Sequence, residues 1–308
     1  MPGWYLWLHG SREATGVDLK FSGLTTFKVL GVAALAISLV SIWPGCKDSS
    51  AATGSASPQA RGGYVTTIYA PVLHAKLMVN PVTSPVWQAM TWRKLTPAPG
   101  HSRLYGVTRV ATAVRHDALY AAFICSGDGL WYQPHANRAD LWRHDAAELW
   151  LDTSKAQNGT NFLEVVMAPN GRTYECWHRA SAPPQPRANG KIDFAYPFSL
   201  IPCKISGLAV MPGQGTFRGQ TVWTLVVKVP LAHLPRPLRV LVPQPKVGAK
   251  FRINLIRYDW HVADGKRRLV QYNLFPIATA CQAFAPYRMG AVVIGSGEAM
   301  SNVALRGP

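Results

Sequence analysis

Short segments in which apolar and polar residues alternate recur along this chain, and this alternation constrains the fold more than any other feature. In residues 221–229 (TVWTLVVKV) one face carries Trp223, Leu225 and Val227, and residues 250–259 (KFRINLIRYD) repeat the pattern. A period of two is typical of β-strands with one buried face. The 24 prolines and 26 glycines separate the segments, and no segment has a persuasive helical stripe. The sequence therefore predicts an all-β fold, an antiparallel β-sandwich of the immunoglobulin or jelly-roll kind with long proline-rich loops.

The positions of further strands and loops follow from the same pattern. Strands are predicted at residues 109–114, 118–125, 147–152, 162–168, 172–178 and 291–295. Short turns join the three strands from 147 to 178, as in a β-meander. The proline-rich stretches 179–202 and 233–248 are expected to be loops at the rim of the sandwich, where binding sites are common.

The N-terminal region has the features of an export signal. Lys28 precedes an apolar run, 29–43, which is short for a membrane span and suits the core of a secretory signal. Gly45 and Cys46 follow and resemble a bacterial lipobox, in which Cys46 would be lipidated. We therefore predict an exported protein, lipid-anchored in the bacterial cell envelope, in the outer membrane or the periplasm. A plain signal anchor is the alternative.

This organisation gives four predicted segments. They are a signal or lipoprotein anchor over 1–46, a flexible Ser/Ala/Gly tether over 47–63, a β-sandwich domain over 64–300 and a tail over 301–308.

Export would place the remaining cysteines in a compartment that permits disulfides. Cys125, Cys176, Cys203 and Cys281 allow three pairings, and a bridge from Cys176 to Cys203 would close the proline-rich stretch between them. Buried free thiols are the alternative. Because no CxxC or HxH spacing occurs, we assign no metal ligands from the sequence.

Charge and missing motifs exclude several functions. Lys and Arg number 32 against 15 Asp and Glu, a net charge of +17 that favours polyanions, anionic membrane surfaces or acidic polysaccharides. The positive residues are scattered, with no zinc-finger or P-loop pattern, so nucleic-acid binding is not predicted. No GxSxG or HExxH nucleophile or metal motif is present.

Acidic residues crowd into residues 140–152 (DLWRHDAAELWLD), which raises the question of catalysis. Asp145 and Glu148 are three apart, so on one strand they point to opposite faces and cannot by themselves flank a glycosidic bond. Glu164, on the next strand, could approach Glu148. A glycosyl hydrolase ranks lowest, because structural roles for Glu148, Asp152 and Glu164 explain these acids more simply.

Tryptophan is abundant, with 11 residues, and several lie where predicted strands end. Trp131, Trp142 and Trp260 are examples. An indole can stack on the apolar face of a pyranose ring while carboxylate, Arg and Asn side chains bind the hydroxyls. A tryptophan that plugs the end of the sandwich is the alternative.

The order of motifs over residues 72–295 resembles the family 9 carbohydrate-binding modules (CBM9), relatives of the DOMON-type sandwiches. The strongest piece is 142–152, with Trp142, Asp145, Glu148 and Asp152 in the family's places. The strand 251–259 and the segment 284–294 (FAPYRMGAVVI) also match.

The resemblance implies a sugar held between aromatic rings, one at Trp142 and the second offered here by Phe284. Trp131 would be a partial wall. The candidate polar contacts are Asp145, Arg252, Asn254 and Arg257. The resemblance implies no required cofactor, although family members can carry calcium in loops.

The leading hypothesis is therefore a non-catalytic carbohydrate-binding protein of the cell envelope, acting in carbohydrate catabolism with partner glycoside hydrolases. The excess of basic over acidic residues favours an acidic or sulfated glycan. The alternative is a haem-binding electron-transfer protein of the DOMON type, with axial ligands drawn from Met167, Met211 and His178.

Overall fold

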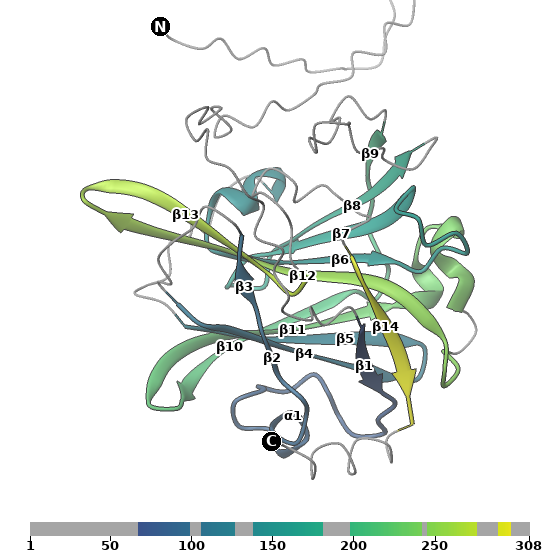
Figure 1. Cartoon of the computed structure of the whole chain (residues 1–308), viewed down its shortest axis with the longest axis horizontal. Coiled ribbons are helices and arrows are strands. Elements are labelled where there is room, and N and C mark those ends of the chain that lie inside the picture. Colours follow the sequence, from purple (N-terminus) through teal and green to yellow (C-terminus); the bar gives the residue numbers. More distant parts are fainter. Residues whose placement is uncertain are drawn as a thin grey trace, which may run out of the picture. The chain divides into compact units, whose positions relative to one another are not determined.

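The alternating segments form two stacked β-sheets in a computed structural model (Figure 1). The structure describes residues 67–98, 106–126, 138–180, 198–241, 245–275 and 289–296. All described residues belong to the unit Ser55–Pro308. The segments 1–46, 47–63 and 301–308 lie outside the described residues, so the anchor, the tether and the tail stay predictions. Among the described residues, none of the helices has the length and apolar character needed to cross a membrane.

One sheet has nine strands. Its main path runs in the order β1 (Thr67–Pro71), β14 (Gly290–Gly295), β12 (Lys250–Ala263), β6 (Ala146–Asp152), β7 (Asn161–Met167), β8 (Thr173–Ala180) and β9 (Phe198–Pro202). Off this path, β13 (Lys266–Asn273) pairs with β12 and with β3 (Thr96–Pro97). The β1–β14 pair is parallel, and the other pairs among the described strands are antiparallel.

The other sheet has five strands, in the order β10 (Ala209–Phe217), β11 (Gln220–Pro230), β5 (Ala118–Ser126), β4 (Thr108–Arg115) and β2 (Arg93–Lys94). Short helices complete the described elements: α1 (Pro85–Gln88) and three 3-10 turns, η1 (Arg138–Arg143), η2 (Leu231–His233) and η3 (Arg236–Leu241).

The core lies between the sheets, where the apolar faces of both meet. Leu149 and Leu151 of β6 pack in one cluster with Phe123 of β5 and with Leu225 and Val227 of β11. Burial of alternate residues on each strand is the normal way in which two sheets form a sandwich core. The predicted all-β sandwich is confirmed.

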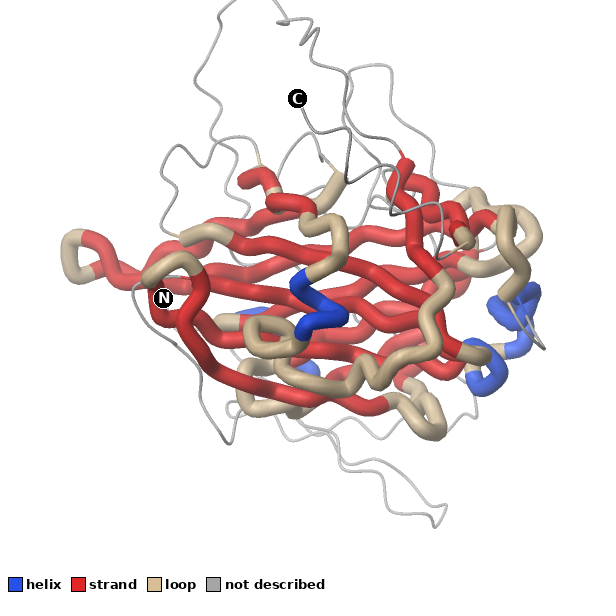
Figure 2. The backbone as a smooth tube through the Cα atoms, turned by 90° about the horizontal axis from the view of Figure 1, so that it is seen from below, coloured by secondary structure: helices blue, strands red, loops and turns tan. Residues whose placement is uncertain are grey.

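A second apolar cluster covers the outer face of the five-stranded sheet. Figure 2 shows α1 and its flanking loops lying across the strands on this side. Trp87 of α1 is fully buried against Ala111 and Ala113, and its Nε1 donates to the Leu77 carbonyl at 2.9 Å. The central strands β4 and β5 of this sheet are therefore buried on both faces, and the protein itself covers their outer side.

The sequence prediction missed six of the described strands, β1, β2, β3, β9, β10 and β13, and for the last three the physical reason is clear. β10 lies at a sheet edge, where Pro212 and exposed polar positions are tolerated but weaken the alternating signal. β13 begins with the exposed residues Lys266, Arg267 and Arg268, and β9 occupies the end of a stretch expected to be loop. Propensity and periodicity are weak guides for strands of this kind, because pairing to a neighbour holds them in place.

Candidate functional site

The outer face of the nine-stranded sheet carries polar and aromatic side chains where the five-stranded sheet carries apolar ones. In β6, Leu149 and Leu151 point into the core, so Glu148 and Trp150 point to the opposite face. Neighbouring strands add further residues to this face in register. We call the following set the outer-face cluster: Glu148, Trp150, Phe162, Glu164, Cys176, His178 and Tyr258. Each of these residues is buried.

Glu148 is held from two directions. Its Oε1 accepts a hydrogen bond from Trp150 Nε1 at 2.8 Å, and its Oε2 accepts one from the Tyr258 hydroxyl at 2.6 Å. The Glu148 carboxyl also hydrogen bonds with that of Glu164 on the adjacent strand. All of these partners come from regular strands, so the carboxyl is fixed in place.

The two carboxyls influence each other strongly. Burial raises the pKa of Glu148 well above its usual range, and repulsion from Glu164 raises it further. Burial also raises the pKa of Glu164, which the hydrogen bond from Glu148 opposes. Two adjacent carboxyls in a desolvated site cannot both ionise easily, so the pair favours a state in which it keeps one shared proton.

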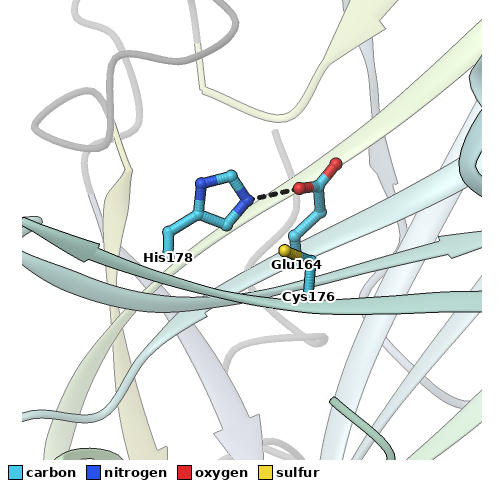
Figure 3. Close-up of side chains that lie close together, drawn as sticks. All are labelled: Glu164, Cys176 and His178. Carbon is cyan, nitrogen blue, oxygen red and sulfur yellow. Dashed lines mark hydrogen bonds and ion pairs between the residues drawn. The ribbon is translucent and has the colours of Figure 1, made fainter. Parts of the chain in front are cut away.

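His178 completes the polar part of the cluster. Its Nε2 donates a hydrogen bond to Oε2 of Glu164 (Figure 3). Its ring also stacks on Phe162, with the ring centroids 4.1 Å apart. Burial lowers the pKa of His178 to about 3, although the nearby Glu148 charge acts in the opposite direction. We therefore treat the imidazole as neutral and its contact with Glu164 as a hydrogen bond rather than an ion pair.

The spacing of the carboxyls does not suit glycoside hydrolysis. The two acids of a glycosidase stand about 5 Å or more apart, so that the scissile bond fits between them. Glu148 and Glu164 are in direct hydrogen-bond contact. They can share a proton, but their carboxyls do not flank a space for a substrate.

A second feature lies where β6 begins and the η1 turn packs against β6, β7, β8 and β12. We call Trp142, Arg143, Asp145, Trp260 and Arg267 the aromatic rim. Trp142 and Trp260 are both half-buried. Trp260 Nε1 donates to the Trp142 carbonyl at 3.0 Å, and the Trp260 backbone N–H donates to Asp145 Oδ1 at 2.8 Å.

Each indole of the aromatic rim carries a guanidinium group on its face. Arg143 lies 5.0 Å from the centroid of the Trp142 ring, and Arg267 lies 4.5 Å from that of Trp260. Arg267 also donates to the Arg143 carbonyl at 2.7 Å. The rim therefore combines two ordered aromatic rings with two guanidinium groups, of which that of Arg143 also pairs with Asp140 at 3.2 Å.

Two of the predicted polar contacts belong to the protein interior. Asp145 is fully buried and orders the backbone at Trp260. Arg257 is also fully buried and points between the sheets, where it binds Thr108, the Ser126 carbonyl and Asp259. Its predicted role as a glycan contact is corrected, because the guanidinium is enclosed by the sandwich core.

The other two predicted polar contacts lie along β12, beyond the aromatic rim. Arg252 donates to the carbonyls of Met289 and Gln157. Asn254 is buried, and its Oδ1 accepts from the backbone N–H of Phe275 at 3.2 Å. Both residues therefore hold neighbouring segments of the chain in place.

Asp152 has a structural role in the turn between β6 and β7. Its carboxylate accepts hydrogen bonds from the backbone N–H groups of Ser154 and Gly159, at 2.9 and 3.1 Å. These bonds fix the turn between β6 and β7. Because β7 carries Glu164, this turn also sets the approach of the outer-face carboxyls.

Several predicted residues lie outside the described part of the chain, namely Trp131, Phe284 and Cys46. The predicted bridge is a different case: Cys176 and Cys203 are both described, and both are free thiols. The Cys176–Cys203 disulfide is thus not formed in the structure. Cys176 instead lies directly opposite Glu164 in the β7–β8 ladder.

The candidate haem ligands are not brought together. Met167 lies in the core between the sheets, and Met211 packs against the cluster on the outer face of the five-stranded sheet. His178 lies on the outer face of the nine-stranded sheet. The three residues thus occupy three different layers and cannot be axial ligands of one haem.

Trp260 is the residue of this region that the sequence did not assign to the site. Its place at the end of an alternating segment was visible, but nothing local linked it to Trp142. Only the pairing of β12 with β6 brings the two indoles to the same end of the sheet.

Comparisons with known proteins support the fold. No family model matches the chain, and no curated protein matches it. A solved structure of a candidate carbohydrate-binding protein from Bacteroides uniformis is 9% identical, with a TM-score of 0.51, covering 74% of this chain and 99% of its own. That likeness shows a shared sandwich fold.

Two further solved structures are of a CBM9 from Caldicellulosiruptor kristjanssonii. The complex with glucose is 12% identical and has a TM-score of 0.47, with 75% of this chain and 96% of that chain covered. The complex with cellotriose is 11% identical, with the same TM-score and 75% and 94% covered. These two structures bear the name of the family that the sequence motifs resemble.

Proposed function

We propose that this protein binds a carbohydrate at the aromatic rim, with Trp142 as the stacking surface and Trp260 as a second one. The observation that carries the proposal is the pair of half-buried indoles linked by the hydrogen bond from Trp260 Nε1 to the Trp142 carbonyl. Aromatic rings stack on the apolar faces of sugars, and rings that are already ordered lose little conformational entropy when a ligand binds.

The charge of the rim favours an acidic or sulfated glycan. Arg143 and Arg267 lie on the two indoles, and the whole chain has a net charge of +17. Guanidinium groups bind carboxylates and sulfate-like anions through paired N–H donors. Binding is therefore expected to weaken as salt rises, because exposed charges are screened over about 8–10 Å at ordinary ionic strength.

Two further points support carbohydrate binding. The motif over residues 142–152 resembles that of the CBM9 family, and the fold is shared with a candidate carbohydrate-binding protein. As part of the same proposal, the protein is exported, is anchored to the cell envelope through lipidated Cys46, and works beside glycoside hydrolases in carbohydrate catabolism. Metabolic labelling with a lipid analogue, lost in Cys46→Ser, tests the anchor.

The binding proposal is tested by affinity electrophoresis in gels that contain acidic, sulfated or neutral polysaccharides. Trp142→Ala and Trp260→Ala should each weaken binding at least tenfold, with circular dichroism to show that folding is kept. Arg143→Gln and Arg267→Gln should reduce the preference for anionic over neutral polysaccharides. Tyr69→Ala is the matched control, because Tyr69 is an exposed aromatic residue of β1 that is not part of the rim. Unchanged binding in both tryptophan variants would refute the proposal.

A further inference from the structure

We propose that Glu164, Cys176 and His178 form a site for a divalent transition metal of the zinc class. One ligand atom from each residue lies within 4.8 Å of the other two, and all three side chains are buried (Figure 3). The site would be structural: on the outer face of the nine-stranded sheet, the bound ion would link β7 to β8.

The sheet register places these three residues together. Glu164 and Cys176 are direct partners in the antiparallel β7–β8 ladder, and His178 follows two residues later on the same face of β8. Side chains that lie directly opposite have Cβ atoms roughly 4.5–5.5 Å apart. Trp177, between the two β8 ligands, packs toward the core, so a slip of one residue would remove both ligands from this face. The hydrophobic core therefore fixes the geometry before any ion binds.

The kind of ligand atom selects the metal. Zinc takes thiolate sulfur, imidazole nitrogen and carboxylate oxygen, whereas calcium and magnesium prefer oxygen alone. Zinc–ligand distances of about 2.0–2.3 Å place the ligands of a tetrahedral ion roughly 3.3–3.8 Å apart. Closing the present arrangement to that size requires small side-chain rotations and leaves the strands where they are.

Glu148 supports the site from behind. Trp150 and Tyr258 hold its two oxygens, and its carboxyl faces that of Glu164. Carboxylates next to metal ligands commonly orient those ligands in this way. The ligand atoms that lie within 4.8 Å of one another are those of Glu164, Cys176 and His178, so Glu148 orients a ligand and is not itself one of the three.

The test uses the full chain, stripped of metal by a chelator under reducing conditions and then titrated with Co²⁺ or Zn²⁺. We expect one ion per chain, a sulfur-to-cobalt charge-transfer band, and a rise in melting temperature with Zn²⁺ but not with Ca²⁺. Cys176→Ser should remove the charge-transfer band, and His178→Gln or Glu164→Gln should weaken Co²⁺ binding at least tenfold.

Cys125→Ser is the control, because Cys125 is a buried thiol of the five-stranded sheet with no place in the site. It should leave the cobalt spectrum unchanged. The proposal is overturned if the wild-type chain shows neither the band nor the thermal shift, a result that does not depend on any variant folding. A band that survives in Cys176→Ser would also overturn it, by assigning the sulfur ligand to another cysteine.

Discussion

Asp145 accepts a hydrogen bond from the backbone N–H of Trp260, with 2.8 Å between Oδ1 and the nitrogen. The two residues are 115 positions apart in the chain, and this contact joins the segment that carries Trp142 to the end of β12. Asp145, which the sequence predicted to contact a ligand, therefore positions the indole of Trp260.

Replacing Asp145 with alanine should loosen Trp260 and weaken glycan binding. A lost hydrogen bond to a charged acceptor costs about 1–3 kcal/mol, so Asp145→Ala should lower the free energy of unfolding by that amount. Asp145→Asn keeps an acceptor oxygen and should recover most of the loss. Urea unfolding and affinity electrophoresis measure both effects. If Asp145→Ala matches the wild type in unfolding free energy and in glycan binding, the hydrogen bond does not position Trp260.

Removing the Arg257 guanidinium should be far more damaging. Arg257 and Asp259 form a fully buried ion pair at 2.8 Å, and Arg257→Met removes the guanidinium group that pairs with the Asp259 carboxylate. Loss of one member of a buried pair costs about 3–5 kcal/mol in unfolding free energy. Arg252→Gln is the comparison, because Arg252 is half-buried and should cost less. Adding Asp259→Leu to Arg257→Met should restore part of the stability, since no buried charge is then left unpaired.

The described thiols should react slowly with iodoacetamide in the native protein near pH 8. Burial raises the pKa of Cys125 and of Cys176 to about 12 and that of Cys203 to about 11. Because the thiolate is the reactive form, alkylation should be fast only after unfolding in urea. Half-buried Cys203 should react before the other two. Peptide mass spectrometry of the alkylated protein distinguishes the sites, and a peptide linking Cys176 to Cys203 under non-reducing conditions would contradict the free thiols.

A methyl group at Gly290 should destabilise the sandwich. A Cβ built there would overlap the ring of Phe275, a side chain that is itself buried. Overpacking of this kind costs about 1–3 kcal/mol, which thermal unfolding of Gly290→Ala can measure. Gly295→Ala on the same strand is the control, because its nearest neighbour, Tyr69 Cδ1, is 4.0 Å away. Combining Gly290→Ala with Phe275→Leu should restore part of the lost stability, because the smaller side chain makes room for the methyl group. If the double variant is no more stable than Gly290→Ala, the clash with Phe275 is not the cause of the loss.

The alternation of residues predicted much of the fold correctly. It identified the strands around Leu149, Leu225 and Ile253, whose side chains form the core. It did not find β10 and β13, because edge strands and exposed hairpins hold few apolar residues at alternate positions. It also placed Glu148 and Leu149 on opposite faces, which the structure confirms.

The sequence by itself determined which side of each strand a residue faces, because that depends on the local pleat with its period of two. It could not determine which strands lie side by side or in what register. The partners of Arg257, which reaches Thr108 across 149 positions, depend on that order, and Cys176 came to lie opposite Glu164 rather than bonded to Cys203. Strand order and register depend on contacts between distant segments, and only burial of the common core selects among them.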